Sequence, residues 1–214
     1  MCKKSELNSF CIRDAVTTDA DALQRMYLDY LGNHDEYMMM NIKNSIARDS
    51  VYVAATDDDR IIGTLTSANV FGYPDFIVED RAIYFRRVRS MSIGSKVVSF
   101  SDNVNCELRN LCVDDAYRRR GVATALLEYA IDKSHGSAYA NVWAPGGQIR
   151  ARNLWESHGF KMQTEINDLG AEFPWFCEKC VERTRECTYC DCYVYVGGRD
   201  VVSIPVVAHS AMAV

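Results

Sequence analysis

The chain has 214 residues, 48% of them hydrophobic and 25% charged, and its 29 acidic against 24 basic side chains give a net charge of −5. This composition excludes a disordered or collagen-like protein, and the acidic balance argues against general nucleic-acid binding. No apolar run approaches the ~18–20 residues that span a bilayer, and the N-terminal residues lead into no apolar signal core. We therefore expect a cytoplasmic protein that binds neither membranes nor nucleic acid.

Apolar periodicity predicts strands and helices that alternate along the chain. The predicted elements are a strand at 10–13, helices over about 17–30 and 35–48, a hairpin of strands 51–55 and 61–66, a strand at 106–113, a helix over about 121–134, a strand at 138–143, a helix over 148–158, and strands at 160–165 and 192–196. This alternation indicates an α/β fold with at least one parallel crossover. The segment 67–105 has a weak pattern and many basic and aromatic residues, so we interpret it either as a functional connection or as a solvated basic surface.

The segment most informative about chemistry lies between the strand at 106–113 and the helix that begins near residue 121. Three arginines, Arg118 to Arg120, precede Gly121, and Ala123 follows one residue later. Small residues let main-chain N–H groups approach a ligand, and the first turn of a helix carries unpaired N–H groups and a partial positive charge. The pattern predicts a phosphate or pyrophosphate site, with a basic loop and a tight glycine turn as the alternative.

The run Arg118-Arg119-Arg120-Gly121-Val122-Ala123 resembles the phosphate loop of the GNAT superfamily of acetyl-CoA-dependent N-acyltransferases, which reads Gln or Arg, two residues, Gly, one residue, and Gly or Ala. A second segment in register is similar to the pattern that follows in this family: Pro145-Gly146-Gly147-Gln148, Ala151, Leu154-Trp155 and Gly159-Phe160. The resemblance covers about 10–165 and a last strand near 192–196.

This resemblance implies a GNAT-like fold, a mixed sheet flanked by helices. Residues 1–166 would form the acetyltransferase core, and 167–214 would hold a cysteine-rich segment, the last core strand and a tail within the same domain. The implied reaction moves an acetyl group from acetyl-CoA to a primary amine of a small molecule or peptide by direct attack. The residues implied to contact acetyl-CoA are Leu111, Cys112, Val113, Arg118, Arg119, Arg120, Gly121, Val122, Ala123, Thr124, Gln148 and Trp155.

Two departures from the family pattern affect the predicted chemistry. Gln148 stands where many relatives have Asn, and Trp155 stands where many have the Tyr that protonates the departing thiolate. An indole N–H is not an acid at physiological pH, so the general acid is unassigned. The candidates are solvent or one of three tyrosines: Tyr117, Tyr193 and Tyr195.

Glu107, on the strand at 106–113, is the candidate general base, with an ordinary ion pair to an arginine as the alternative. The Trp155 substitution also keeps open a second function, a non-catalytic acyl-CoA-binding sensor. The acceptor amine is left open among a peptide N-terminus, a lysine side chain, a polyamine and an aminoglycoside, and a homodimer is left open as the oligomeric state.

Five of the nine cysteines fall within 177–192. Cys177-x2-Cys180-x6-Cys187-x2-Cys190 offers four thiolates for a tetrahedral structural zinc ion, although the central gap of six is short for such a site. The alternatives are a reversible redox pair, or buried and free thiols, since Cys190 and Cys192 alternate on a predicted strand. Cys112 is interpreted as a core residue of its strand and not as a covalent acyl carrier.

Overall fold

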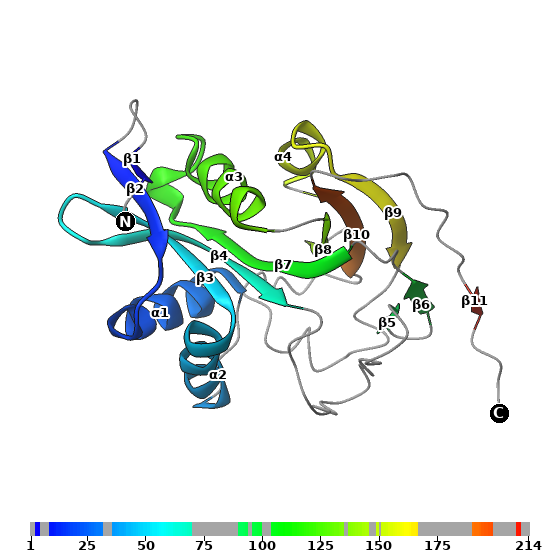
Figure 1. Cartoon of the computed structure of the whole chain (residues 1–214), viewed down its shortest axis with the longest axis horizontal. Coiled ribbons are helices and arrows are strands. Elements are labelled where there is room, and N and C mark those ends of the chain that lie inside the picture. Colours follow the sequence, from blue (N-terminus) through cyan, green and yellow to red (C-terminus); the bar gives the residue numbers. More distant parts are fainter. Residues whose placement is uncertain are drawn as a thin grey trace. The chain divides into compact units, whose positions relative to one another are not determined.

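The computed structural model describes residues 3–4, 9–31, 36–69, 90–93, 96–99, 104–134, 137–145, 149, 151–166, 190–198 and 209–210. Figure 1 shows the described elements along the chain. These are β1 (Lys3–Lys4), β2 (Phe10–Asp14), η1 (Thr17–Asp19), α1 (Ala20–Leu31), α2 (Glu36–Arg48), β3 (Ser50–Thr56), β4 (Ile61–Asn69), β5 (Ser90–Ile93), β6 (Lys96–Ser99), β7 (Val104–Val113), η2 (Asp115–Tyr117), α3 (Val122–Lys133), β8 (Ser137–Pro145), α4 (Arg152–Ser157), β9 (Lys161–Ile166), β10 (Cys190–Gly198) and β11 (His209–Ser210).

Most predicted elements are found at their expected places, and two differences matter. The short strands β5 and β6, which pair in antiparallel fashion, lie in the segment that had no clear pattern. The helix predicted over 148–158 is wrong in length, because α4 begins at Arg152. Ala151, before its first turn, has the non-helical backbone angles φ −103° and ψ 14°, and no side chain caps this helix.

The described residues fall into two compact units. The first comprises those up to Ala68 and those from Glu107 to Ser134, and the second comprises the remainder. In the first unit the strand order is β1-β2-β3-β4-β7, and the neighbours from β1 to β4 are antiparallel. No helix in the described residues has the length and apolar character that crossing a membrane requires.

Helices cover both faces of the sheet in the first unit (Figure 1). Val51 and Val53 of β3 join the apolar cluster with Leu23 of α1 and Ile42 of α2. Tyr52, on the alternate face of β3, packs edge-on against Tyr129 of α3, with the ring centroids 5.1 Å apart. The period-two alternation of β3 thus places α1 and α2 on one face and α3 on the other.

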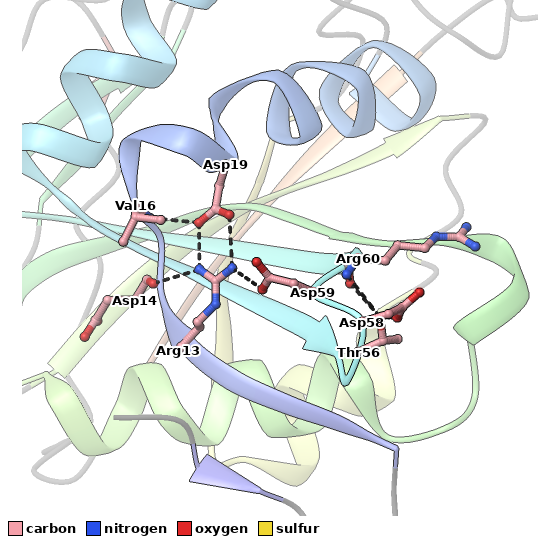
Figure 2. Close-up of polar contacts among 8 residues, drawn as sticks. All are labelled: Arg13, Asp14, Val16, Asp19, Thr56, Asp58, Asp59 and Arg60. Atoms are coloured by element: carbon pink, nitrogen blue, oxygen red, sulfur yellow. Dashed lines mark hydrogen bonds and ion pairs between the residues drawn. The ribbon is translucent and has the colours of Figure 1, made fainter.

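A charged network fixes the start of α1 against the turn between β3 and β4 (Figure 2). The guanidinium of Arg13 donates to both carboxylate oxygens of Asp19, at 2.7 and 3.0 Å, and to Asp59 at 2.8 Å. The main-chain N–H of Val16 also donates to Asp19, at 2.8 Å. Burial alone would raise the pKa of Asp19, but the hydrogen bonds from Arg13 and Val16 and the charge of Arg13 outweigh it, so this pKa is lowered.

The second unit contains the three-stranded order β8-β10-β9, in which β10 is antiparallel to both neighbours. Its fully buried side chains include Tyr139, Phe160 and Tyr195. Trp155 of α4 packs edge-on against Phe160 at 5.1 Å between centroids. A separate three-stranded order, β11-β6-β5, is also antiparallel.

Candidate functional site

The predicted phosphate loop connects β7 to α3 through the single 3-10 turn η2. Asp114, the residue after β7, donates its main-chain N–H to the carbonyl of Ile62 on β4 at 2.9 Å. Its carboxylate accepts the N–H of Ala116 at 2.9 Å and pairs with Arg60 at 2.6 Å. The entry to the loop is therefore held by β4 and by the hairpin turn before it.

The N-terminus of α3 has the features of an anion site. Its cap residue is Gly121, which has the left-handed angles φ 81° and ψ 2°, and no side chain caps the helix. The first turn of α3 carries no acidic residue. The first-turn N–H groups, which have no intrahelical acceptor, and the positive end of the helix dipole are thus available to an anion.

The three arginines of the loop are not equivalent. Arg118 pairs with Asp115 at 2.6 Å, and its guanidinium lies over the ring of Tyr30, 5.4 Å from the centroid. Arg120 lies over the ring of Tyr117 at 5.4 Å. Arg119 has a left-handed backbone, φ 58°, and no side-chain partner in the part of the chain that the structure describes. Arg119 is therefore the most available charge of the triplet.

Tyr30, near the end of α1, is a site residue that the sequence interpretation missed. Its hydroxyl accepts the main-chain N–H of Asp115 at 3.1 Å, while its ring lies beneath Arg118. Burial raises the pKa of Tyr30. Tyr30 also packs against the apolar cluster of α1, but no local signal in the sequence links it to a loop 85 positions away.

Gly63 of β4 is a second residue that was missed, and it sets the distance between β4 and the first turn of α3. A Cβ atom at this position would lie 2.7 Å from Cγ1 of Val122, 3.1 Å from Leu126 and 3.3 Å from the carbonyl oxygen of Cys112. A lone glycine inside a strand is a known sign of such a close approach, so the signal was present in the sequence.

We expect Gly63→Ala to destabilise the chain by about 1–3 kcal/mol, because the added methyl group overpacks the contact between β4 and α3. The measurement is the free energy of unfolding from urea denaturation. Val122→Ala removes the nearest clashing atom, so the same substitution made in that background should cost less. Equal costs in both backgrounds would contradict the packing explanation.

The candidate base Glu107 lies on β7 and is largely buried. Its carboxylate is 3.9 Å from Nη1 of Arg109, whose Nη2 is 3.0 Å from the carboxylate of Asp49. The ion pair with an arginine is therefore present, whereas the role of Glu107 as general base stays a prediction. Cys112 is buried in the apolar cluster, and this burial raises its pKa to about 12, so its thiol is neutral near pH 7 and is a poor nucleophile.

The remaining predicted residues lie in the second unit or outside the described residues. Trp155 is buried against Phe160, and its indole N–H has no hydrogen-bond partner among the described residues. Of the candidate acids, Tyr193 donates its hydroxyl to Glu165 at 2.8 Å, and the buried hydroxyl of Tyr195 has no partner in the described part of the chain. Gln148 lies outside the described residues.

The cysteine cluster cannot be assessed from the described residues. Cys177, Cys180 and Cys187 lie outside them, and only the main chain of Cys190 is described, in β10. Within the described ranges, no group of three or more metal-binding side chains is present. The zinc site stays a prediction, to be checked by metal analysis of protein purified without added zinc.

Comparison with known proteins identifies a family. The sequence profile of the Acetyltransferase (GNAT) family matches residues 20–160. Mycothiol acetyltransferase of Clavibacter sepedonicus is 38% identical over 80 residues, which are 37% of this chain and only 25% of that protein.

The fold is similar to those of solved acetyltransferases. NAA60 of Arabidopsis thaliana, solved with a bisubstrate analogue, has a TM-score of 0.58 at 18% identity and covers 87% of this chain and 96% of its own. The yncA protein of Salmonella typhimurium, solved with its cofactor acetyl-CoA, has a TM-score of 0.56 at 16% identity. The match covers 92% of this chain and 98% of the yncA chain. These likenesses show the mixed α/β fold. Together with the profile match over most of the sequence, they establish that the chain belongs to the GNAT acetyltransferase family.

Proposed function

We propose that the chain transfers the acetyl group of acetyl-CoA to a primary amine by direct attack. The observation that carries this proposal is the uncapped N-terminus of α3, where left-handed Gly121 is preceded by three arginines. A pyrophosphate would accept hydrogen bonds from the first-turn N–H groups there, and Arg119 would add a full positive charge. Support also comes from the family assignment and from the yncA protein, whose structure holds acetyl-CoA.

In this proposal the main chain around Leu111, Cys112 and Val113 binds the pantetheine arm and the thioester carbonyl. The amine nitrogen attacks the carbonyl carbon, the C–S bond breaks, and the thiolate leaves and takes up a proton. Glu107 or water would accept the proton that the amine loses. Alignment of the amine and an N–H donor for the developing oxyanion would supply most of the rate enhancement.

The acceptor is proposed to be an amine of a small molecule or of a peptide. One solved structure of similar fold is the ribosomal-protein-S18-alanine N-acetyltransferase of Escherichia coli, and the Clavibacter relative is named for mycothiol, so the comparisons do not choose between these classes. The segment shared with that relative is a quarter of its length. A cytoplasmic location is a further part of this proposal.

Release of free CoA thiol from acetyl-CoA tests the function. The panel should contain a peptide with a free N-terminus, the same peptide with a blocked N-terminus and one lysine, a polyamine and an aminoglycoside. We expect amine-dependent release with at least one of them, and no stimulation by the fully blocked, lysine-free peptide. Acetyl-CoA binding without turnover on any amine would instead favour the acyl-CoA sensor, which the Trp155 substitution keeps open.

A further inference from the structure

Two arginines and a tyrosine form a cluster beside the helix terminus assigned to the pyrophosphate. The guanidinium carbons of Arg60 and Arg120 lie 5.7 and 5.4 Å from the centroid of the Tyr117 ring. These are the distances of cation–π contacts. We call Arg60, Tyr117 and Arg120 the Tyr117 cluster. Because Arg120 directly precedes Gly121, the cap residue of α3, the cluster adjoins the proposed phosphate site.

Arg60 comes from a different part of the chain than the other two members of the cluster. It directly precedes β4, and Figure 2 shows its side chain extending away from the contact of Asp59 with Arg13. Its guanidinium pairs with Asp114 at 2.6 Å, and its side chain is still 58% exposed. Contacts between exposed charged side chains stabilise a fold only slightly, so stability alone is a weak reason for this arrangement.

The loop also carries more positive charge than its ion pairs neutralise. Asp115 pairs with Arg118 at 2.6 Å, and the other acidic residue of the loop pairs with Arg60. Arg119 and Arg120 are exposed and have no ion-pair partner within the described ranges. An exposed guanidinium without a carboxylate partner is able to bind an anion, and one that already rests on an aromatic ring loses less conformational freedom when it does so.

Acetyl-CoA has a third phosphate group, for which the helix terminus does not account. Its pyrophosphate is bonded to an adenosine whose ribose carries a phosphate monoester at the 3′ position. A phosphate monoester has a second pKa of about 6, so it carries about two negative charges at pH 7, and the planar guanidinium of arginine matches its oxygens. The ribose is bonded directly to the pyrophosphate, so a group that binds the 3′-phosphate must lie next to the terminus of α3, as Arg120 does.

We propose that the Tyr117 cluster binds the 3′-phosphate of acetyl-CoA and selects donors that carry this group. Arg120 donates hydrogen bonds to the phosphate oxygens. Tyr117 is a positioning residue that holds the guanidinium of Arg120, and Arg60 adds a second charge on the same ring, which Asp114 partly neutralises. This inference rests on the proposed function only in taking CoA as the ligand, and it does not require that transfer occurs.

The test compares CoA with 3′-dephospho-CoA, which lacks only this phosphate. Isothermal titration of the full chain measures the affinity for each ligand, and the ratio of the two affinities is the readout. We expect CoA to bind at least about tenfold more tightly, as charge-assisted hydrogen bonds to a phosphate would provide. Damage to the loop or to the pyrophosphate site would lower both affinities together, so a merely structural role of the cluster would leave the ratio unchanged.

Substitutions within the cluster should change this ratio to different extents. Arg120→Ala should reduce the ratio to less than about threefold, and Arg60→Ala should reduce it by a smaller factor, because Arg60 already has an ion-pair partner. Tyr117→Leu removes the ring and should act like Arg120→Ala. Tyr117→Phe keeps the ring and should retain the wild-type ratio.

Lys133→Ala is the matched control. It removes an exposed cation that lies 5.4 Å from the centroid of the Tyr129 ring at the other end of α3, so it should leave the ratio unchanged. Equal affinities of the wild-type chain for CoA and 3′-dephospho-CoA, or a wild-type ratio in Arg120→Ala, would overturn the proposal.

An assay of turnover separates this inference from the proposed function. If CoA is preferred and Arg120→Ala removes the preference, but no amine is acetylated, then the 3′-phosphate site holds and the transfer proposal fails. If an amine is acetylated but the wild-type chain binds both ligands equally, then transfer holds and the 3′-phosphate site fails.

Discussion

Gly121→Glu is expected to lower the affinity for acetyl-CoA at least about 100-fold, because it places a carboxylate at the N-terminus of α3 where a phosphate would bind. Two like unit charges 4 Å apart repel by about 4 kcal/mol near a protein surface, which is more than this loss requires. The left-handed φ of 81° at Gly121 adds a backbone penalty of about 1–2 kcal/mol for any L-residue. Isothermal titration with acetyl-CoA measures the affinity, and thermal unfolding checks that the variant is folded.

Gly121→Gln is the matched control for charge. Glutamine has the shape of glutamate and the same backbone penalty, so the ratio of the two affinities isolates the carboxylate. That ratio should shrink as salt is added, because the site is exposed and screening is effective there. Equal affinities for the two variants would show that phosphate does not bind at this helix terminus.

Asp19→Ala is expected to lower the free energy of unfolding by about 3 kcal/mol, because it leaves the guanidinium of Arg13 without its bidentate partner. The side chain of Asp19 is 8% exposed, whereas that of Asp59, the second partner of Arg13, is 77% exposed. Asp59→Ala therefore serves as the control, with an expected cost below about 1 kcal/mol. Urea denaturation of the three proteins measures both costs.

The same network predicts a pH dependence. The pKa of Asp19 is lower in the folded chain than in the unfolded chain, so the unfolded chain binds the additional proton as the pH falls. The contribution of Asp19 is thus complete above its unfolded pKa of about 3.9 and is lost as the pH falls through its folded pKa. The difference between wild type and Asp19→Ala should be constant from pH 5 to 7 and shrink below about pH 4. A constant difference down to pH 2 would contradict this assignment.

Local sequence patterns were sufficient to predict most of the secondary structure and the position of the phosphate loop. The hairpin of β3 and β4 follows from two apolar runs around an acidic turn, and α3 follows from its apolar stripe after Gly121. These features depend on neighbours a few residues apart, which a single sequence displays directly.

The parts that were missed depend on contacts between distant segments. Tyr30 reaches the loop across 85 positions. The lone glycine of β4 signals a close approach, but the sequence does not show that α3 is the element that approaches it. The helix predicted over 148–158 began too early, because no side chain caps α4 and so no local signal marks its start at Arg152.

The hydrogen bonds and the ion pair that fix the loop between β7 and α3 have a thermodynamic consequence for ligand binding. Asp114, Arg118 and Tyr30 hold this loop by contacts within the protein alone. A phosphate that arrives there does not have to order the main chain that receives it, so little conformational entropy is lost on association. Binding should therefore show a small entropic penalty from the protein, and a variant that releases the loop, such as Tyr30→Ala, should weaken binding chiefly by making its entropy less favourable.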